Sequence, residues 1–245
     1  MSDRHIFRLS GPDTHSFLQG LVTNDVDGLK DGLVYAALLT PQGKYMADFF
    51  LVPDGDAVLL DAHGDQADML RQRLTMYKLR ANVMLEDTDL HVHRGTGDIP
   101  ADGLADPRHK AMGWRAYRDT AQTDDTTDWT ALRVAHMIPE TGIELTPDTF
   151  ILEVGFDTLN GVDFRKGCYV GQEVTARMKH KTTLRKGLAP VLVAGAADPG
   201  TEIKAGEKPA GTLLSRAGDK AIAYLRFDRA EGDMQAGEAT VTRTE

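Results

Sequence analysis

The only cysteine of the chain, Cys168, lies in the segment 166–173, Lys-Gly-Cys-Tyr-Val-Gly-Gln-Glu. The residues after Gly171 predict a helix, because acidic and amide side chains come first and basic side chains come last. A helix N-terminus and the cations of Arg165 and Lys166 all favour a thiolate over a thiol. The flanking glycines indicate backbone that is tight or closely approached. A lone cysteine is often a small buried hydrophobe, but these neighbours favour a reactive thiol.

Glu153 is the second residue that could take part in binding or catalysis, because it interrupts the apolar run 150–156. If that run is buried, the carboxylate needs a hydrogen-bonding or cationic partner from the protein or from a ligand. The donor edge of a pterin suits it, since paired charge-assisted hydrogen bonds are strong. The alternative is a helix position that faces water, and periodicity alone leaves both interpretations open.

The basic residues are concentrated around the cysteine. Residues 165–186 carry a formal charge of +6, whereas the rest of the chain carries −15 from 21 basic and 36 acidic residues. This segment is either a solvated basic helix face or a local site for a small anion. The net charge of −9 argues against a nucleic-acid-binding protein.

The sequence offers no ligand set for a metal. One cysteine cannot hold an iron–sulfur cluster, which normally takes four protein ligands. His91 and His93 share a strand face but lack a third ligand nearby. The stretch 95–97 lacks the third glycine and the strand-to-helix context of a dinucleotide-binding loop. We therefore expect no bound metal.

Composition places the chain among ordinary globular proteins, with 41% apolar and 27% charged residues. No run of eighteen apolar residues predicts a membrane span, and the first residues do not resemble a targeting segment. A single cysteine excludes an internal disulfide and suits a reducing compartment. These features predict a cytoplasmic protein that does not associate with membranes.

The elements that must position these residues follow an α+β pattern. A helix is predicted after residues 10–13 and another over 64–78. The predicted strands are 33–40, 45–52, 58–60 and 81–85, and the turn 41–44 joins the first two. Antiparallel pairing is expected for most of these strands.

The second half of the chain has a different pattern of polar and apolar residues. Residues 119–128 are polar and aperiodic and predict a loop, and a short helix is predicted over 129–137. From about residue 184, short apolar runs alternate with glycine-rich turns, which indicates a small β-barrel or sandwich. We expect a first region over 1–183 and a C-terminal domain over 184–245.

The segment 166–173 resembles the K-G-C-Y-x-G-Q-E signature of the YgfZ-type folate-binding proteins. These are relatives of the glycine-cleavage T-protein, an aminomethyltransferase, and they support maturation or repair of iron–sulfur enzymes. The resemblance extends over nearly the whole chain. It includes the segments 11–13, 17–20, 23–25, 40–44, 146–147 and 153–156.

The resemblance implies a T-protein-like fold, with two interleaved α+β domains in a ring and a small C-terminal β-barrel. It implies a pocket for tetrahydrofolate or a derivative, with Glu153 on the pterin edge. Lys166, Arg177 or Arg185 would meet the glutamate carboxylates of the folate, and Cys168 would face the pocket as the reactive thiol, with Lys166 beside it. The other residues expected at this site are Asn24, Asp48, Tyr169, Gly171, Gln172 and Glu173.

Two features depart from the related families. True aminomethyltransferases carry an acidic or related residue where Cys168 stands, and their Arg-Asp-rich segment is not evident here. The stretch 133–139 is similar to the family element R-x-x-x-G-I-P, but Met137 stands where glycine is usual.

Three functions remain open from the sequence. The first is a monomeric, folate-binding accessory protein for iron–sulfur cluster assembly, whose partners are iron–sulfur enzymes or assembly proteins. The second is a folate-dependent aminomethyl or one-carbon transferase, for which Asp48 is the acid nominated near the pterin. The third is a folate-free interaction scaffold.

Overall fold

An antiparallel sheet of five strands, in the order β2-β3-β4-β1-β5, forms the centre of the first part of the chain. The structure is a computed structural model and describes residues 4–244. The strands of this sheet are β1 (Arg4–Ser10), β2 (Val34–Leu39), β3 (Tyr45–Asp54), β4 (Ala57–His63) and β5 (Met84–Asp87). The predicted hairpin is confirmed, since β2 and β3 pair antiparallel around the turn 40–44.

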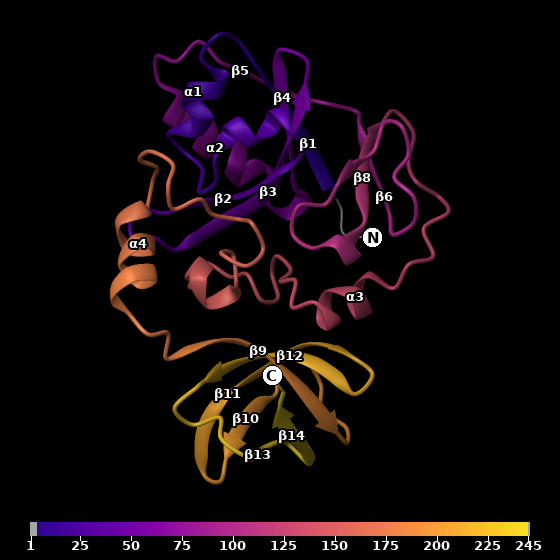
Figure 1. Ribbon diagram of the computed structural model, residues 1–245, viewed down its shortest axis with the longest axis vertical. Coiled ribbons are helices and arrows are strands. Elements are labelled where there is room, and N and C mark those ends of the chain that lie inside the picture. Colours follow the sequence, from indigo (N-terminus) through magenta and orange to yellow (C-terminus); the bar gives the residue numbers. More distant parts are fainter. Residues whose placement is uncertain (1–3, 245) are drawn as a thin grey trace. The chain divides into compact units, whose positions relative to one another are not determined.

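Two helices cover the sheet, α1 (Thr14–Gln19) and α2 (Ala67–Lys78) (Figure 1). Leu18 of α1 and Leu70 and Leu74 of α2 share one buried cluster with Phe7 and Leu9 of β1. The helical spacing of Leu70 and Leu74 explains this packing, because residues four apart lie on one face. The 3-10 helices η1 (Val26–Lys30) and η2 (Gly64–Gln66) occupy the connections.

A smaller sheet of three strands, in the order β6-β8-β7, follows along the chain. Its elements are β6 (His91–Gly95), β7 (Leu104–Ala105), η3 (Lys110–Met112) and β8 (Trp114–Arg118). Residues 119–128 then contain no helix or strand, as the sequence predicted.

Buried ion pairs join the two sheets. Asp61 of β4 is fully buried and accepts hydrogen bonds from Arg4 Nε at 2.6 Å and from Arg115 Nη1 at 3.0 Å. The Tyr117 hydroxyl donates to the same carboxylate at 3.0 Å. Arg115 also lies 3.3 Å from Asp106. Local sequence patterns did not predict this network.

The C-terminal part is a closed barrel of six strands, in the order β10-β11-β12-β9-β14-β13, drawn in orange to yellow in Figure 1. The alternating burial of β9 shows its inward face, which includes Ala189, Val191 and Val193. The barrel strands are β9 (Lys186–Ala194), β10 (Glu202–Ala205), β11 (Lys208–Ala217), β12 (Lys220–Arg226), β13 (Asp233–Ala236) and β14 (Ala239–Arg243).

Two compact units divide the chain. The first contains the residues up to 127 together with 157–174, and the second contains 128–156 together with 175 onward. The second unit therefore adds α3 (Trp129–Ala135) and η4 (Ile151–Val154) to the barrel, while α4 (Gln172–Lys181) carries the chain from the first unit to the second. The expected boundary between 183 and 184 stays a prediction.

Met137 has the left-handed φ of 55°, which a residue with a side chain rarely adopts. The glycine that the resemblance implies at this position would adopt this φ without strain. Among residues 4–244, none of the helices has both the length and the apolar character that crossing a membrane requires.

Candidate functional site

Cys168 is a free, exposed thiol in the loop that precedes α4. The residues on either side differ in exposure: Lys166 and Tyr169 are buried, whereas Gly167 is exposed. The predicted helix after Gly171 is confirmed, with Glu173 in its first turn and Lys179, His180 and Lys181 in its last. The thiol is therefore presented to solvent by a loop with buried anchors.

The first anchor is the ammonium of Lys166. Its Nζ donates hydrogen bonds to the carbonyl oxygens of Val22 at 2.6 Å and Asn24 at 2.7 Å. Burial lowers the pKa of Lys166 to about 8, against the opposing influence of Asp25 and Asp163. Its amine thus ties the cysteine loop to residues 22–24.

Residues 23 and 24 hold the same loop through further hydrogen bonds. The Thr23 hydroxyl donates to the Gly161 carbonyl at 2.7 Å, and the amide of Asn24 donates to the Asn160 carbonyl at 2.6 Å and to Tyr35 of β2 at 2.8 Å. The resemblance implied a place for Asn24 at the folate site. In the structure, its amide nitrogen connects the segments that support the cysteine.

Two glycines, Gly43 and Gly171, allow the turn 40–44 and the start of α4 to lie close together. Gly171 has φ +83°, and a Cβ there would lie 2.6 Å from the Thr40 carbonyl oxygen. Gly43 has φ +75°, and a Cβ there would lie 2.8 Å from Val174 Cβ. Side chains at these positions would push the turn 40–44 away from the start of α4. Gly167 differs, because a Cβ there would meet nothing within 4 Å, and so the expected close approach applies only to Gly171.

Tyr169 is the second buried anchor, and its ring centroid lies 5.3 Å from Lys166 Nζ. The side chain of Gln172 reaches back and donates to the Gly167 carbonyl at 3.4 Å. Glu173 is exposed. The structure therefore brings Asn24, Lys166, Tyr169 and Gln172 to the support of the cysteine loop.

Asp48 lies in β3, the second strand of the first hairpin, and is buried. Its two carboxylate oxygens accept hydrogen bonds from the hydroxyls of Tyr35 at 3.0 Å and Tyr45 at 2.6 Å. Burial, followed by the neighbouring Asp48 charge, raises the pKa of Tyr35 well above its usual value. Tyr35 therefore stays a neutral donor to this carboxylate.

Glu153 belongs to η4 in the second unit and is 7% exposed, which is the buried alternative of the two that the sequence left open. Its Oε2 accepts a hydrogen bond from the Tyr224 hydroxyl at 2.6 Å, and its Oε1 lies 3.8 Å from Lys186 Nζ. Burial and the bond to Glu153 raise the pKa of Tyr224. Both partners come from the barrel, and local sequence patterns predicted neither.

Arg177 and Arg185 are exposed and also belong to the second unit, as Glu153 does. Cys168, Lys166, Asn24 and Asp48 belong to the first. Within residues 4–244, no three His, Cys, Asp or Glu side chains gather in a way that could hold a metal ion. In the described chain the thiol therefore has no set of protein ligands around it with which to share a metal.

A solved structure shows which fold this is. The aminomethyltransferase T of the glycine cleavage system from Bartonella henselae matches 100% of this chain and 83% of its own with a TM-score of 0.76. At 12% identity this likeness shows the fold alone. Residues 185–245 match the family described as the CAF17 C-terminal β-barrel domain. The expected T-protein-like fold with a C-terminal barrel is confirmed.

Similar proteins with curated names show to which family the chain belongs. An iron–sulfur cluster assembly factor IBA57 of Mus musculus is 31% identical, and the match covers 96% of this chain and 78% of the relative. Homologues named in the same way from Mycosarcoma maydis and Pyricularia oryzae are 34% and 32% identical over 77% and 79% of the chain. The chain spans 55% and 56% of the length of these two fungal relatives.

These relatives are all named as mitochondrial proteins. This finding contradicts the cytoplasmic location predicted from the sequence, which rested on the single cysteine and on the first residues. The identity and coverage of the mouse relative exceed what a shared fold alone produces. The chain belongs to the IBA57 family of iron–sulfur cluster assembly factors.

Proposed function

We propose that this chain assists the assembly or repair of iron–sulfur clusters on other proteins, and that the Cys168 thiolate coordinates an iron atom of the cluster. The observation that carries the proposal is the exposure of the only cysteine. A single thiol cannot hold a cluster by itself, so the remaining ligands must come from a partner. The partners are iron–sulfur enzymes or assembly proteins, and the chain acts on them as a monomer.

The anchored loop supports this role. Lys166 and Tyr169 are buried on either side of the thiol, and hydrogen bonds hold Lys166 at two carbonyls. A ligand that is already positioned loses less conformational freedom when it binds. An exposed thiol on a fixed loop can therefore reach a cluster on another protein without reorganising its own unit.

Complementation tests the thiol. In cells that lack this chain, we expect Cys168→Ala to leave the activity of dependent iron–sulfur enzymes as low as in the empty-vector strain. Gly167→Ala is the matched control, since its Cβ meets nothing within 4 Å, and it should restore full activity. Full rescue by Cys168→Ala at equal protein levels would remove the thiol from the function.

We further propose that the second unit binds tetrahydrofolate or a derivative, with Glu153 accepting hydrogen bonds from the pterin. Within the described residues, Glu153 Oε1 has no partner nearer than Lys186 Nζ at 3.8 Å, so it retains capacity for a donor. The exposed guanidinium groups of Arg177 and Arg185 suit carboxylates of a folate tail. Asp48 and Lys166 fit a folate less well, because both oxygens of Asp48 and two of the three donors of Lys166 are engaged by the protein.

Titration calorimetry tests folate binding separately. Tetrahydrofolate should bind the wild type and bind Glu153→Gln at least tenfold more weakly, because the amide offers a donor where the pterin also offers donors. A useful control is Glu238→Gln, which changes an exposed carboxylate in the turn between β13 and β14. Absence of saturable heat with the wild type would refute folate binding and leave the role of Cys168 unaffected.

A folate-dependent transferase is the weaker alternative. Its nominated acid, Asp48, is held by two tyrosine hydroxyls, and no further observation favours transfer chemistry. Incubation with tetrahydrofolate and an aminomethyl-lipoyl carrier protein should form no methylenetetrahydrofolate at turnover rates.

A further inference from the structure

The loop that joins α2 to β5 in the first unit presents apolar side chains to solvent. Leu79, at the end of α2, is 85% exposed, and Met76 of α2 and Met84 of β5 are exposed as well. These are three of the six large apolar side chains that are exposed within residues 4–244. Apolar side chains that gather on a surface mark interaction sites more often than isolated ones do. The proposed role of Cys168 does not use them.

Leu79 also has a backbone conformation that is unusual for a residue with a side chain. Its φ is 40° and its ψ is −99°, and a side chain at positive φ is strained. Glycine would adopt this φ without strain, and the leucine side chain is not buried in the core. The fold therefore does not require leucine at this position. Strain of this kind occurs most often where a residue serves a function.

Hydrogen bonds fix the loop that carries Leu79. The Lys78 ammonium donates to the Val83 carbonyl at 2.9 Å, which ties the end of α2 to the start of β5. The backbone N–H of Asn82 donates to Asp13 Oδ2 at 2.7 Å. Leu79 therefore projects from a held loop, and a contact with it costs little conformational entropy.

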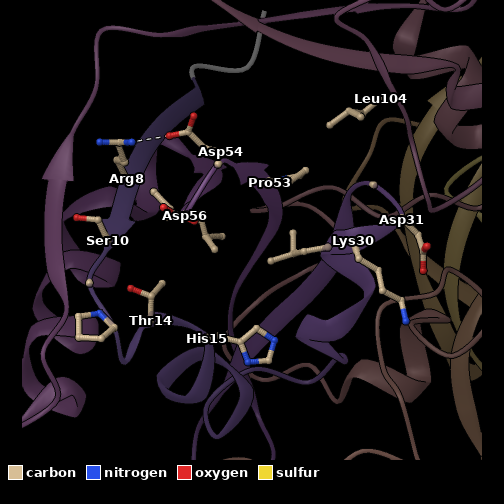
Figure 2. A pocket seen from close by; sticks show the side chains of 17 residues that line it. Arg8, Ser10, Thr14, His15, Lys30, Asp31, Pro53, Asp54, Asp56 and Leu104 are labelled. Carbon is tan, nitrogen blue, oxygen red and sulfur yellow. Dashed lines mark hydrogen bonds and ion pairs between the residues drawn. The ribbon is translucent and has the colours of Figure 1, made fainter.

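The charges near Leu79 are positive. Residues 69–85 contain four basic residues and no acidic one. Arg73 and Arg80 form no ion pair with any residue that the structure describes. Arg8 of the same unit differs, because it pairs with Asp54 at 2.7 Å (Figure 2). We define the Leu79 surface as Arg73, Met76, Leu79, Arg80 and Met84.

These features favour a protein over a membrane or a nucleic acid as the partner. The apolar face of α2, with Leu70 and Leu74, is buried in the core, so the helix cannot lay that face on a bilayer. Two cations without an ion pair are fewer than the roughly four to eight of a lipid-binding cluster. The net charge of −9 disfavours nucleic acid. Apolar side chains among cations suit an apolar hollow with carboxylates on its rim.

We infer that the Leu79 surface docks on a protein partner of the chain. Leu79 enters an apolar hollow of the partner, and Arg73 and Arg80 face its carboxylates. The inference rests on the proposed function, since the partner is one of the iron–sulfur enzymes that the chain serves. It adds the surface that recognises the partner, whereas Cys168 coordinates the cluster.

Binding of the full chain to a cluster-free iron–sulfur enzyme tests the inference, because Cys168 has no iron to coordinate in that complex. The enzyme is one whose activity depends on the chain in complementation, and the affinity is measured by biolayer interferometry. Leu79→Ala and Arg80→Glu should each bind at least tenfold more weakly than the wild type. Ile99→Ala, which truncates another exposed apolar residue of the same unit, should stay within twofold, as should Cys168→Ala.

The thermal unfolding of a second variant separates docking from a structural role. Leu79→Gly should bind the enzyme as weakly as Leu79→Ala, yet unfold at the wild-type temperature or higher, because glycine relieves the strain at φ 40°. A lower unfolding temperature would show that the leucine side chain supports the fold, and would overturn the inference.

Two other results would overturn the docking surface and leave the role of Cys168 intact. The first is equal affinity of Leu79→Ala and the wild type for the cluster-free enzyme. The second is binding of the wild type to phosphatidylserine vesicles, or its dimerisation, that Leu79→Ala abolishes while the affinity for the enzyme is unchanged. That result would assign the Leu79 surface to a membrane or to a second copy of the chain.

Discussion

Replacing Asp61 with Asn removes the charge at the centre of the buried network in the first unit. The carboxylate is fully buried and accepts hydrogen bonds from Arg4, Arg115 and Tyr117. An Asn side chain has nearly the same shape but carries no charge and has one oxygen fewer. Asp61→Asn therefore leaves two arginine cations, from β1 and β8, without the carboxylate that they share.

The cost follows from the burial of this pair. Removing one partner of a buried salt bridge costs about 3–5 kcal/mol, since the remaining charge stays out of water. For a chain of this size each kcal/mol lowers the unfolding temperature by about 2–4 °C. We therefore expect the transition of the first unit to fall by roughly 6–20 °C in differential scanning calorimetry.

Asp65→Asn provides the matched control on the 3-10 helix that follows β4. The Asp65 side chain is 88% exposed and lies 3.7 Å from His63, so its loss should change stability by less than about 1 kcal/mol. If Asp61→Asn melts within about 2 °C of the wild type, the reasoning about the buried network is refuted.

Three further predictions concern single backbone or side-chain features. Met137→Gly should raise the unfolding free energy by about 0.5–1 kcal/mol in urea titrations, because glycine tolerates φ 55°; a loss of stability would contradict this. Gly171→Ala should displace the turn 40–44 and abolish complementation, whereas Gly167→Ala should not, and equal activity of the two variants would argue against the close approach. The pKa of Lys166 is about 8 in the folded chain and 10.5 for the free side chain, so the unfolded chain binds more protons between these values. The stability of the wild type relative to Lys166→Met should therefore rise from pH 8 to pH 10, and a flat or falling difference would contradict the burial of this amine.

Local patterns predicted the first hairpin and a small C-terminal β-domain but missed β1. The apolar residues Ile6 and Phe7 of β1 are adjacent in sequence, so its alternation is weak. The strand lies between β4 and β5, whose residues pair with it from 49 or more positions away. Pairing over such a distance leaves no local signal.

Glu153 shows what a local sequence pattern can indicate and what it cannot. The charge inside an apolar run left two alternatives open, a buried carboxylate that needs partners and a helix position that faces water. The structure shows the buried one. The partner Tyr224 lies 71 positions along the chain and could not be identified from local spacing. Asp61 interrupts the apolar residues of β4 in the same way, and the same argument would have identified it.

The neighbours of the cysteine show that a position close to Cys168 in the sequence does not determine where a side chain points. Arg165 and Lys166 were both expected to favour a thiolate by their charge. The Arg165 side chain is 93% exposed and lies 3.8 Å from Asp163, whereas the ammonium of Lys166 is bound to backbone carbonyls. Which way a side chain turns depends on distant segments such as residues 22–24, and the sequence does not state their position.

Alkylation of Cys168 gives the most direct test of its role as a cluster ligand. This thiol is the only one in the chain, so mass spectrometry assigns iodoacetamide labelling of the chain to it alone. The reaction is followed anaerobically with an iron–sulfur enzyme whose activity depends on the chain in complementation. The cluster-loaded enzyme should slow labelling of Cys168 at least tenfold relative to the same enzyme without its cluster. Equal labelling rates with the loaded and the cluster-free enzyme would contradict the claim that Cys168 binds a cluster iron.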